Sequence, residues 1–282
     1  MNADESMLTP KAVLPPVSGV ITLTSDFGLR DPFVGVMKGR ILSCFAHAQV
    51  IDLTHEILAH WPAEAGFWLS RAFEYFPNGS VHIAVVDPGV GTARKIALVE
   101  ADGHLFLAPD NGLLAPVVQR ARQARVWHLR PEILHTLGLS RVSATFHGRD
   151  IFAPLAAELA SGRRTIESLG VPCEELVPSW VDDPIVSSGR VQGVIITVDH
   201  FGNLLSNIDA LSLDGWREPV VRVGQQRLPL RRTYGEVQPG EPLALINSFG
   251  VIEVAVAERR AMDVLGVSRG APITVVEGVR RR

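Results

Sequence analysis

Two short polar clusters in the sequence contain residue types that can hold and activate a small molecule. In the first, Asp87 and Arg94 enclose a glycine-rich segment, and in the second, residues 145–152, His147 follows an aromatic residue. Each cluster comes directly after an apolar, strand-like run, where α/β proteins commonly carry their sites. Asp87, Arg94 and His147 would supply a carboxylate, a permanent cation and a titratable imidazole. Such a set can hold and deprotonate a water molecule.

The same residues also have structural interpretations. Asp87 and Arg94 could form an ion pair that only braces the loop, although Gly89 and Gly91 between them favour close approach of a ligand to the backbone. A single histidine such as His147 is more often structural than reactive. We therefore expect a functional role for the first cluster and give the second only modest added weight.

Further candidates follow other predicted strands. Asp26 ends the first strand-like run and could accept both hydroxyls of a ribose, or could cap a helix. Trp61 and Phe146 could enclose an aromatic base, although buried aromatic residues usually belong to the core. Asp199 could bind an ammonium group, and residues 247–250 could close the same site. Both of these segments are also plausible hairpin turns.

The elements that would position these residues alternate between strand and helix in the first half of the chain. Such alternation predicts a mostly parallel sheet covered by helices. Asp102-Gly103 predicts a tight hairpin inside this region. The expected strands are residues 20–24, 48–53, 80–86, 96–100 and 105–108, and the expected helices are residues 33–44, 61–75, 112–122 and 151–160.

The pattern changes after Gly170, where short strands separated by glycine, proline and asparagine turns predict a smaller antiparallel β-barrel. The expected barrel strands are residues 193–198, 219–223, 243–246, 251–257 and 273–276. The predicted organisation is a loose tail (1–18), an α/β domain (19–176), a linker (177–190) and the C-terminal β-barrel domain (191–282).

Composition limits the partners. The 282 residues are 46% hydrophobic and 20% charged, which suits a packed core, and the net charge of -3 gives no field that favours nucleic acid or an anionic membrane. No apolar run approaches the roughly 20 residues of a membrane span. The first 18 residues do not resemble a signal peptide. The only two cysteines, Cys44 and Cys173, are far apart, which fits a reducing cytoplasm.

Several common catalytic motifs are absent from the sequence. It contains no phosphate-binding G-x-x-x-x-G-K-[ST] loop, no G-x-G-x-x-G after the first strand, no H-E-x-x-H and no G-x-S-x-G. Scattered acids and histidines could bind a divalent metal, but their spacing matches no standard site. A metal-dependent hydrolase of a nucleoside or phosphate ester therefore stays a second-rank alternative. The residues concerned are Asp26, Asp31, Asp52, His55, Asp87 and His147.

Eight short segments occur in a fixed order along the chain: TSDFG at 24–28, GVMKG at 35–39, DLTHEI at 52–57, VVDPGVGT at 85–92, PDNGLL at 109–114, TFHGRD at 145–150, DHFGN at 199–203 and NSFG at 247–250. Each segment alone is a weak signal, but the ordered set is specific. The set resembles one known family, the S-adenosyl-L-methionine (SAM) hydroxide adenosyltransferases, which are relatives of the fluorinases and chlorinases, and the resemblance spans residues 20 to 278.

The resemblance implies a fold, a reaction and an assembly. It implies an N-terminal α/β domain and a C-terminal β-barrel, in a homotrimer with sites between the N-domain of one subunit and the C-domain of the next. The implied reaction cleaves SAM, the substrate, to adenosine and L-methionine with water or hydroxide as the nucleophile. No metal or other cofactor is implied.

The resemblance also implies roles for individual residues. The implied reacting group is Asp87, Arg94 and His147. The implied substrate contacts are Asp26 at the ribose, the aromatic residues Trp61, Phe146 and Phe201 around the base and ribose, Asp199 and Ser248 at the methionine amino group, and Asn203 at the adenine.

Two alternatives remain within this resemblance. A non-catalytic sensor of SAM or adenosine could keep the pocket without turnover. A SAM-dependent halogenase could share the scaffold, but residues 95–108 form only a short hairpin where fluorinases carry a long insertion, which favours water. Residues 257–261 (AERRA) depart from the small residues of many relatives.

Overall fold

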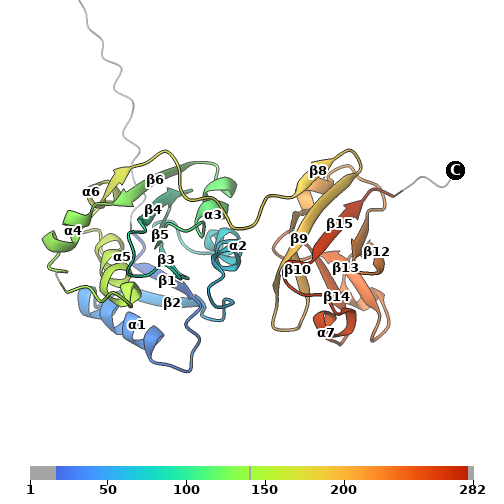
Figure 1. Ribbon diagram of the computed structural model, residues 1–282, viewed down its shortest axis with the longest axis horizontal. Coiled ribbons are helices and arrows are strands. Elements are labelled where there is room, and N and C mark those ends of the chain that lie inside the picture. The colour runs from blue at the N-terminus through green and yellow to red at the C-terminus, as the bar shows by residue number, and fades with distance from the viewer. Residues whose placement is uncertain (1–16, 140, 279–282) are drawn as a thin grey trace, which may run out of the picture. The chain divides into compact units, whose positions relative to one another are not determined.

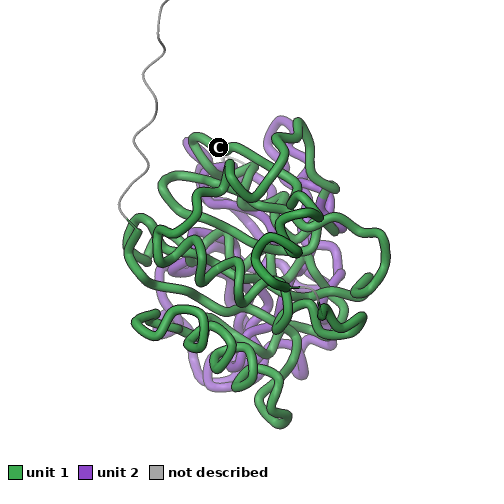
Figure 2. The backbone as a smooth tube through the Cα atoms, turned by 90° about the vertical axis from the view of Figure 1, so that its left-hand side faces the viewer, with its two compact units in different colours: residues 1–178 green, residues 179–282 purple. Residues whose placement is uncertain are grey.

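The computed structural model describes residues 17–139 and 141–278, and the chain divides into two compact units between Pro178 and Ser179 (Figure 2). Most of the expected N-terminal tail lies outside the described residues. Ser18 lies within them, and its backbone N–H donates to the Gly79 carbonyl at 3.3 Å. No helix in the described ranges is long and apolar enough to cross a membrane.

The first unit contains a seven-stranded sheet with the order β2-β1-β3-β5-β4-β6-β7 (Figure 1). Neighbours in the run β2-β1-β3-β5 are parallel, whereas β4 is antiparallel to β5 and β6, and β7 is antiparallel to β6. Strands β2, β1, β3, β5 and β6 thus share one direction, which confirms the mostly parallel sheet. The strands are β1 (Val20–Ser25), β2 (Gln49–Thr54), β3 (Val81–Val85), β4 (Ile96–Ala101), β5 (His104–Pro109), β6 (Ala124–Leu129) and β7 (Gly170–Pro172).

Helices cover both faces of this sheet. In Figure 1, α1 and α5 lie on one face, and α2 and α3 lie on the other. Successive residues of β3 point to opposite faces, so Ile83 belongs to the core beneath α1 and α5 and Ala84 to the core beneath α2 and α3. The helices are α1 (Phe33–Cys44), α2 (Pro62–Ala72), α3 (Ala115–Arg120), α4 (Pro131–Thr136), α5 (Ala153–Ala160) and α6 (Ile166–Leu169), and a π-helical turn (Gly148–Phe152) leads into α5.

The turn between β4 and β5 is the tight hairpin that the sequence predicts. Asp102 has φ 45° and Gly103 has φ 83°, and left-handed backbone at both central positions is the requirement of a type I′ turn. Strands β6 and β7 extend the sheet beyond this hairpin and were not expected from the sequence.

The second unit is a closed barrel of seven strands, β10-β14-β13-β12-β11-β15-β9, with β9 also paired to β10. This confirms the predicted barrel, although two of its strands, β10 and β12, were not expected from the sequence. The pairing also differs from a purely antiparallel barrel, because residues 232–241 carry the chain back before β13 begins and β12 and β13 therefore pair in parallel. The strands are β9 (Arg190–Val198), β10 (Leu204–Asp209), β11 (Val220–Val223), β12 (Gln226–Arg231), β13 (Pro242–Ile246), β14 (Val251–Val256) and β15 (Pro272–Val276), and α7 is Ala261–Leu265.

One short strand lies in the segment expected to be a linker. Strand β8 (Ile185–Ser187) pairs with the start of β9 and so adds an eighth strand outside the closed ring. The apolar side chains of Ile185 and Val186 in this strand are exposed.

A chain of buried polar side chains crosses the first unit's core on the face beneath α2. The Thr22 hydroxyl lies 2.7 Å from Nδ1 of His82, and Nε2 of His82 lies 3.1 Å from Nδ1 of His104. The His82 ring stacks on Phe106 with centroids 4.9 Å apart. Burial, followed by the charge of His104, lowers the pKa of His82 from 6.5 to about 3.

This histidine makes the protein sensitive to acid. Below pH 6.5 the unfolded chain protonates His82 while the folded chain does not. The contribution of the neutral, buried His82 to the unfolding free energy is therefore present above pH 6.5 and is lost as the pH falls toward 3. Between pH 7.5 and 5.5 we expect wild-type protein to lose about 1.4 kcal/mol more unfolding free energy than His82→Gln. Urea denaturation at both pH values measures this difference. The exposed His135→Gln control should match wild type, and equal pH dependence in His82→Gln and wild type would contradict the assignment.

Candidate active site

The topology of the sheet brings two acidic residues to the same edge. Strands β1 and β3 are parallel neighbours, and Ser25 pairs with Val85 at their carboxyl ends. Asp26 follows the first of these strands, and Asp87 lies two residues after the second. Both acids therefore lie on loops at the edge where parallel sheets commonly bind ligands.

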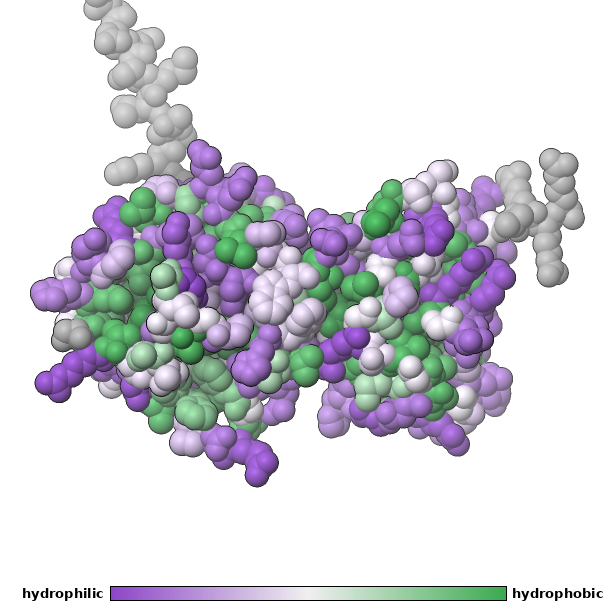
Figure 3. Space-filling view, in the orientation of Figure 1, coloured by the Kyte–Doolittle hydropathy of each residue, from purple (hydrophilic) through white to green (hydrophobic). Residues whose placement is uncertain are grey.

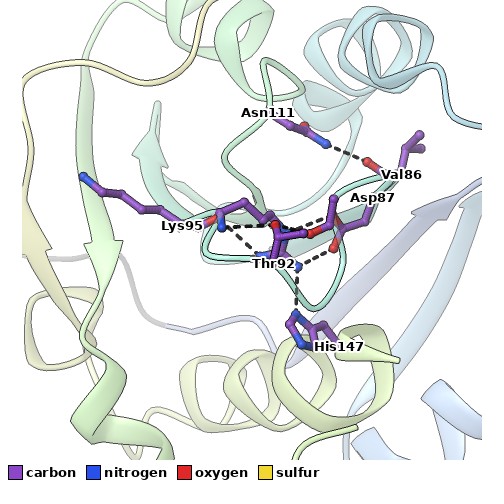
Figure 4. Close-up of polar contacts among 8 residues, drawn as sticks. Val86, Asp87, Thr92, Lys95, Asn111 and His147 are labelled. Carbon is purple, nitrogen blue, oxygen red and sulfur yellow. Dashed lines mark hydrogen bonds and ion pairs between the residues drawn. The ribbon is translucent and has the colours of Figure 1, made fainter. Parts of the chain in front are cut away.

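The loop after β3 is shaped by its own hydrogen bonds (Figure 4). The Thr92 hydroxyl donates to the Gly89 carbonyl at 2.7 Å and accepts the backbone N–H of Arg94 at 3.3 Å. Gly91 has φ +76°, and a Cβ atom there would lie 2.2 Å from the Ala144 carbonyl oxygen. Glycine at this position therefore lets the loop pack directly against the segment that carries the second polar cluster.

Arg94 joins Asp87 to His147. Its Nε donates to Asp87 Oδ1 at 2.8 Å, and its Nη2 contacts Asp87 Oδ2 and also lies 2.9 Å from Nδ1 of His147. The side chains of Asp87 and Arg94 are only 5% and 10% exposed, so each charge depends on the other for compensation.

This arrangement fixes the tautomer of His147. A guanidinium can only donate, so Nδ1 of His147 accepts and the hydrogen of the neutral ring lies on Nε2. Burial, and then the charge of Arg94, lower the pKa of His147 and keep the ring neutral. His147 therefore has a hydrogen to donate and no free lone pair with which to take a proton.

A pocket of about 300 Å³ lies beside this group. Asp26, Asp87, Phe146 and His147 line it, together with Phe27 and Phe33 among others. The three phenylalanines contact one another, mostly edge to face, with ring centroids 5.4–6.0 Å apart. The pocket thus joins an apolar aromatic wall to two carboxylates, which is typical of a small-molecule site.

The carboxylate of Asp26 is oriented by a backbone hydrogen bond from the loop before α2. Its Oδ2 atom accepts the backbone N–H of His60 at 2.9 Å, and His60 has left-handed backbone with φ 64°. Trp61, the next residue, does not line the pocket but precedes the first turn of α2. Phe27 and Phe33 occupy the aromatic wall instead, and the only sequence signal for them was Phe27 inside the TSDFG segment.

The remaining predicted residues belong to the second unit. The carboxylate of Asp199 accepts the backbone N–H of Asn203 at 2.8 Å and its side-chain amide at 3.1 Å. Phe201 and Asn203 line a pocket of about 490 Å³ in this unit. Phe201 is 72% exposed. Ser248 lies exposed in a turn and is not among the residues that line this pocket.

The departing segment 257–261 also belongs to this second pocket. Glu258, Arg259 and Arg260 line it, and Arg260 donates to the His200 carbonyl at 2.9 Å. Gly202 has φ +85°, and a Cβ atom there would lie 2.6 Å from Cβ of Arg260. The arginine is thus packed against the turn that carries Phe201.

A buried carboxyl group near this pocket was not expected from the sequence. Glu253 is 3% exposed, accepts the Tyr234 hydroxyl at 2.6 Å and accepts the Asn247 side-chain amide at 3.1 Å. Burial raises the pKa of Glu253. Glu253 lies within an otherwise apolar strand, and the sequence carries no signal that its carboxyl group is buried and hydrogen-bonded.

Among the residues that the structure describes, no three histidine, cysteine, aspartate or glutamate side chains form a potential metal-binding group. The six scattered acids and histidines considered as metal ligands are therefore not gathered into one cluster.

Comparison with known proteins decides the family. Residues 21–170 match the N-terminal domain of the SAM hydroxide adenosyltransferases, and residues 193–274 match their C-terminal domain. The chain belongs to the SAM hydroxide adenosyltransferase family. The resemblance that the eight sequence segments indicated is thereby confirmed.

Relatives within the family cover almost the whole chain. The (R)-S-adenosyl-L-methionine hydrolase of Thermus thermophilus is 39% identical over 258 residues, which cover 89% of this chain and 97% of the relative. The hydrolase of the same name from Salinispora tropica is 39% identical over 272 residues (92% and 98%). A fluorinase from an Actinoplanes species is 28% identical over 286 residues (84% and 90%).

The fold is shared as well. The crystal structure of an uncharacterized conserved protein from Thermotoga maritima matches with a TM-score of 0.81 and 35% identity, covering 91% of this chain and 100% of that one. The sheet, the barrel and their order along the chain therefore belong to a fold seen by experiment in a relative.

The tautomer of His147 can be tested directly by NMR. Long-range ¹H–¹⁵N spectra of the imidazoles, with His147→Gln to assign the signals, should show the hydrogen on Nε2 and a pKa below 6.5. In Arg94→Met the pKa of His147 should rise relative to wild type, because a neighbouring cation is removed. Hydrogen on Nδ1 in the wild-type protein at pH 7.5 would contradict the geometry.

Proposed function

We propose that this protein hydrolyses SAM to adenosine and L-methionine. The observation that carries the proposal is the hydrogen-bonded group Asp87–Arg94–His147 beside the pocket that also contains Asp26. The support from comparison is that relatives at 31–39% identity over most of the chain are named (R)-S-adenosyl-L-methionine hydrolase, whereas those named fluorinase are 26–28% identical.

The reaction is a displacement at C5′ of the ribose. The oxygen of water forms a bond to C5′ as the bond from C5′ to the sulfonium sulfur breaks, and the electron pair of that bond stays on sulfur. Methionine leaves as a neutral thioether, so no acid is needed to protonate it. The oxygen loses one proton to solvent, and the demand on the protein is to place a weak nucleophile in line.

The three side chains divide this task. His147 donates its Nε2 hydrogen to the attacking oxygen, which stabilises hydroxide character there. Arg94 holds the other nitrogen of the ring and remains charged throughout. Asp87 orients Arg94 and compensates its charge, so that the cationic sulfonium does not meet an isolated positive group. This assignment makes His147 a donor rather than a general base.

The substrate contacts follow the same proposal. Asp26 accepts the ribose hydroxyls, and Phe146 packs against the nucleoside in the first pocket. Asp199 and Ser248 bind the methionine amino group, and Phe201 and Asn203 bind the adenine side. Trp61 does not line this cavity, so the proposal assigns it no substrate contact in the first pocket.

The proposal includes a cytoplasmic homotrimer in which the second unit of a neighbouring subunit completes each site. Two free cysteines support a reducing compartment. Apolar patches lie among polar side chains on the visible face (Figure 3). Large apolar residues are also exposed on and beside α1 and on β2, an edge strand, which suits an assembly surface. These residues are Leu29, Phe33, Val36, Leu42 and Ile51.

The decisive test is to incubate chelator-treated protein with SAM in ¹⁸O-labelled water and analyse the products by mass spectrometry. We expect free methionine and adenosine with one ¹⁸O at the 5′ position. Asp87→Asn should lower kcat by about 10²–10³-fold, because Arg94 loses the charge that orients it. Its affinity for adenosine should remain within a few-fold of wild type.

The matched control for this experiment is Asp31→Asn, an exposed aspartate outside the pocket, which should keep wild-type kcat. Tight SAM binding without turnover would favour a sensor, halide-dependent products would favour a halogenase, and loss of activity with chelator would favour a metal-dependent hydrolase. Any of these results would overturn the proposal.

Complementation tests where the site is completed. Asp87→Asn impairs the first unit and Asp199→Asn impairs the second, so each variant alone should be nearly inactive. When the two are co-expressed, random assortment in a cyclic trimer leaves about a quarter of the sites with both residues intact. Activity should therefore return, as measured by adenosine release. If each site were built from a single chain, the mixture would stay as inactive as its parts.

A further inference from the structure

A second polar network lies beside residues that line the first pocket and takes no part in the reaction described above. It is buried at His55 and Ser25 and open to solvent at Lys38 and Asp52. Nζ of Lys38 on α1 lies 2.6 Å from Asp52 Oδ2 at the edge strand β2, and Asp52 Oδ1 lies 3.0 Å from Nε2 of His55. Nδ1 of His55 lies 2.7 Å from the Ser25 hydroxyl at the end of β1. His55 and Ser25 are only 3% and 2% exposed.

The direction of each contact follows from the donors available. Nε2 of His55 approaches Asp52 as an ion-pair contact without the alignment of a full hydrogen bond. A carboxylate can only accept, so we place the hydrogen of the ring on Nε2, and Nδ1 then accepts from the Ser25 hydroxyl. The Ser25 oxygen in turn accepts the backbone N–H of Phe27 at 3.3 Å. The donors of Lys38 and His55 lower the pKa of Asp52 despite its partial burial, so this end of the chain stays ionised. Each contact of the network thus has one assigned donor and one assigned acceptor.

The network ties together two loops, residues 25–28 and 55–60. The His55 carbonyl accepts the backbone N–H of Gly28 at 2.8 Å, and the Ser25 carbonyl accepts that of Ile57 at 3.4 Å. The second loop then returns to Asp26, through the His60 N–H that binds its carboxylate at 2.9 Å. The orientation of Asp26 therefore depends on the loop that His55 anchors.

The network does not line the pocket, but the residues it holds do. Asp26 and Phe27 come from the first loop and Ala59 and His60 from the second, and all four line the cavity. His55 and Ser25 therefore reach a ligand only through these neighbours.

We infer that His55, oriented by Asp52 and Lys38, is a positioning residue that aims the Asp26 carboxylate at the ribose hydroxyls of the substrate. The inference rests on the proposed function, in which Asp26 binds the ribose. It assigns to the Lys38–Asp52–His55–Ser25 network a role in selecting a ribose that carries both hydroxyls.

The test compares two ligands that differ only at those hydroxyls. Calorimetry of the full-length protein with adenosine and with 2′,3′-dideoxyadenosine gives the preference for the hydroxyls as a ratio of dissociation constants. By analogy with hydrogen-bonding partners behind metal ligands, His55→Phe should weaken adenosine binding by roughly tenfold or more. Binding of the dideoxy ligand should stay unchanged, so the preference collapses.

A second variant covers a failure of His55→Phe to fold. Asp52→Asn changes a more exposed group, leaves the His55 ring in place and should reduce the preference in the same direction by a smaller factor. The matched control is Thr54→Val, which removes a hydrogen bond to the Glu56 N–H in the same loop but lies outside the network. It should keep the wild-type preference. In the double variant Asp26→Asn with His55→Phe, the preference should differ little from that of Asp26→Asn alone. Both substitutions act on the same contact, that between position 26 and the ribose hydroxyls.

The outcomes separate the inference from the proposed function. If wild-type protein prefers adenosine and the His55 and Asp52 variants weaken both ligands equally or neither, the network is merely structural and the inference fails while the hydrolase proposal stands. If wild-type protein binds neither nucleoside and does not cleave SAM, the proposed function fails and the inference fails with it.

Discussion

The buried ion pair between Asp87 and Arg94 is the interaction on which the geometry of the candidate site depends. Two charges that are 5% and 10% exposed are stable only as a well-bonded pair, so the loop that carries both must keep one shape. Gly91 permits that shape by packing where a Cβ atom would overlap the Ala144 carbonyl. Nη2 of Arg94, which also contacts Asp87, then fixes the tautomer of His147 and with it the direction in which that ring can donate.

The sequence predicts much of this because the decisive relations are local or topological. Asp87 and Arg94 lie in one loop seven residues apart, and the apolar runs before Asp26 and Asp87 indicate strands whose parallel pairing must bring their carboxyl ends together. The barrel was predictable from its short strands and turns. The parallel pairing of β12 with β13 was not, because it depends on how residues 232–241 return the chain rather than on any strand's own pattern.

What the sequence leaves open is the choice of partners over long separations. Ser25 and His55 are 30 residues apart, and whether their side chains meet depends on how two loops pack. Glu253 interrupts an apolar strand and could equally have pointed to solvent, until Tyr234 and Asn247 are placed beside it. Trp61 illustrates the converse, since its type suits an aromatic wall but the turn before α2 leaves that position to Phe27 and Phe33.

The two carboxylates of the first pocket are electrostatically unequal, and the inequality suits a cationic substrate. Arg94 compensates Asp87, whereas in the described part of the chain no cation pairs with Asp26, which a backbone N–H binds. The pocket thus offers an uncompensated carboxylate at Asp26 and a nearly neutral ion pair at Asp87 and Arg94. SAM carries a sulfonium charge that adenosine and the methionine thioether lack, so under the proposed assignment attraction to Asp26 favours the substrate over its products.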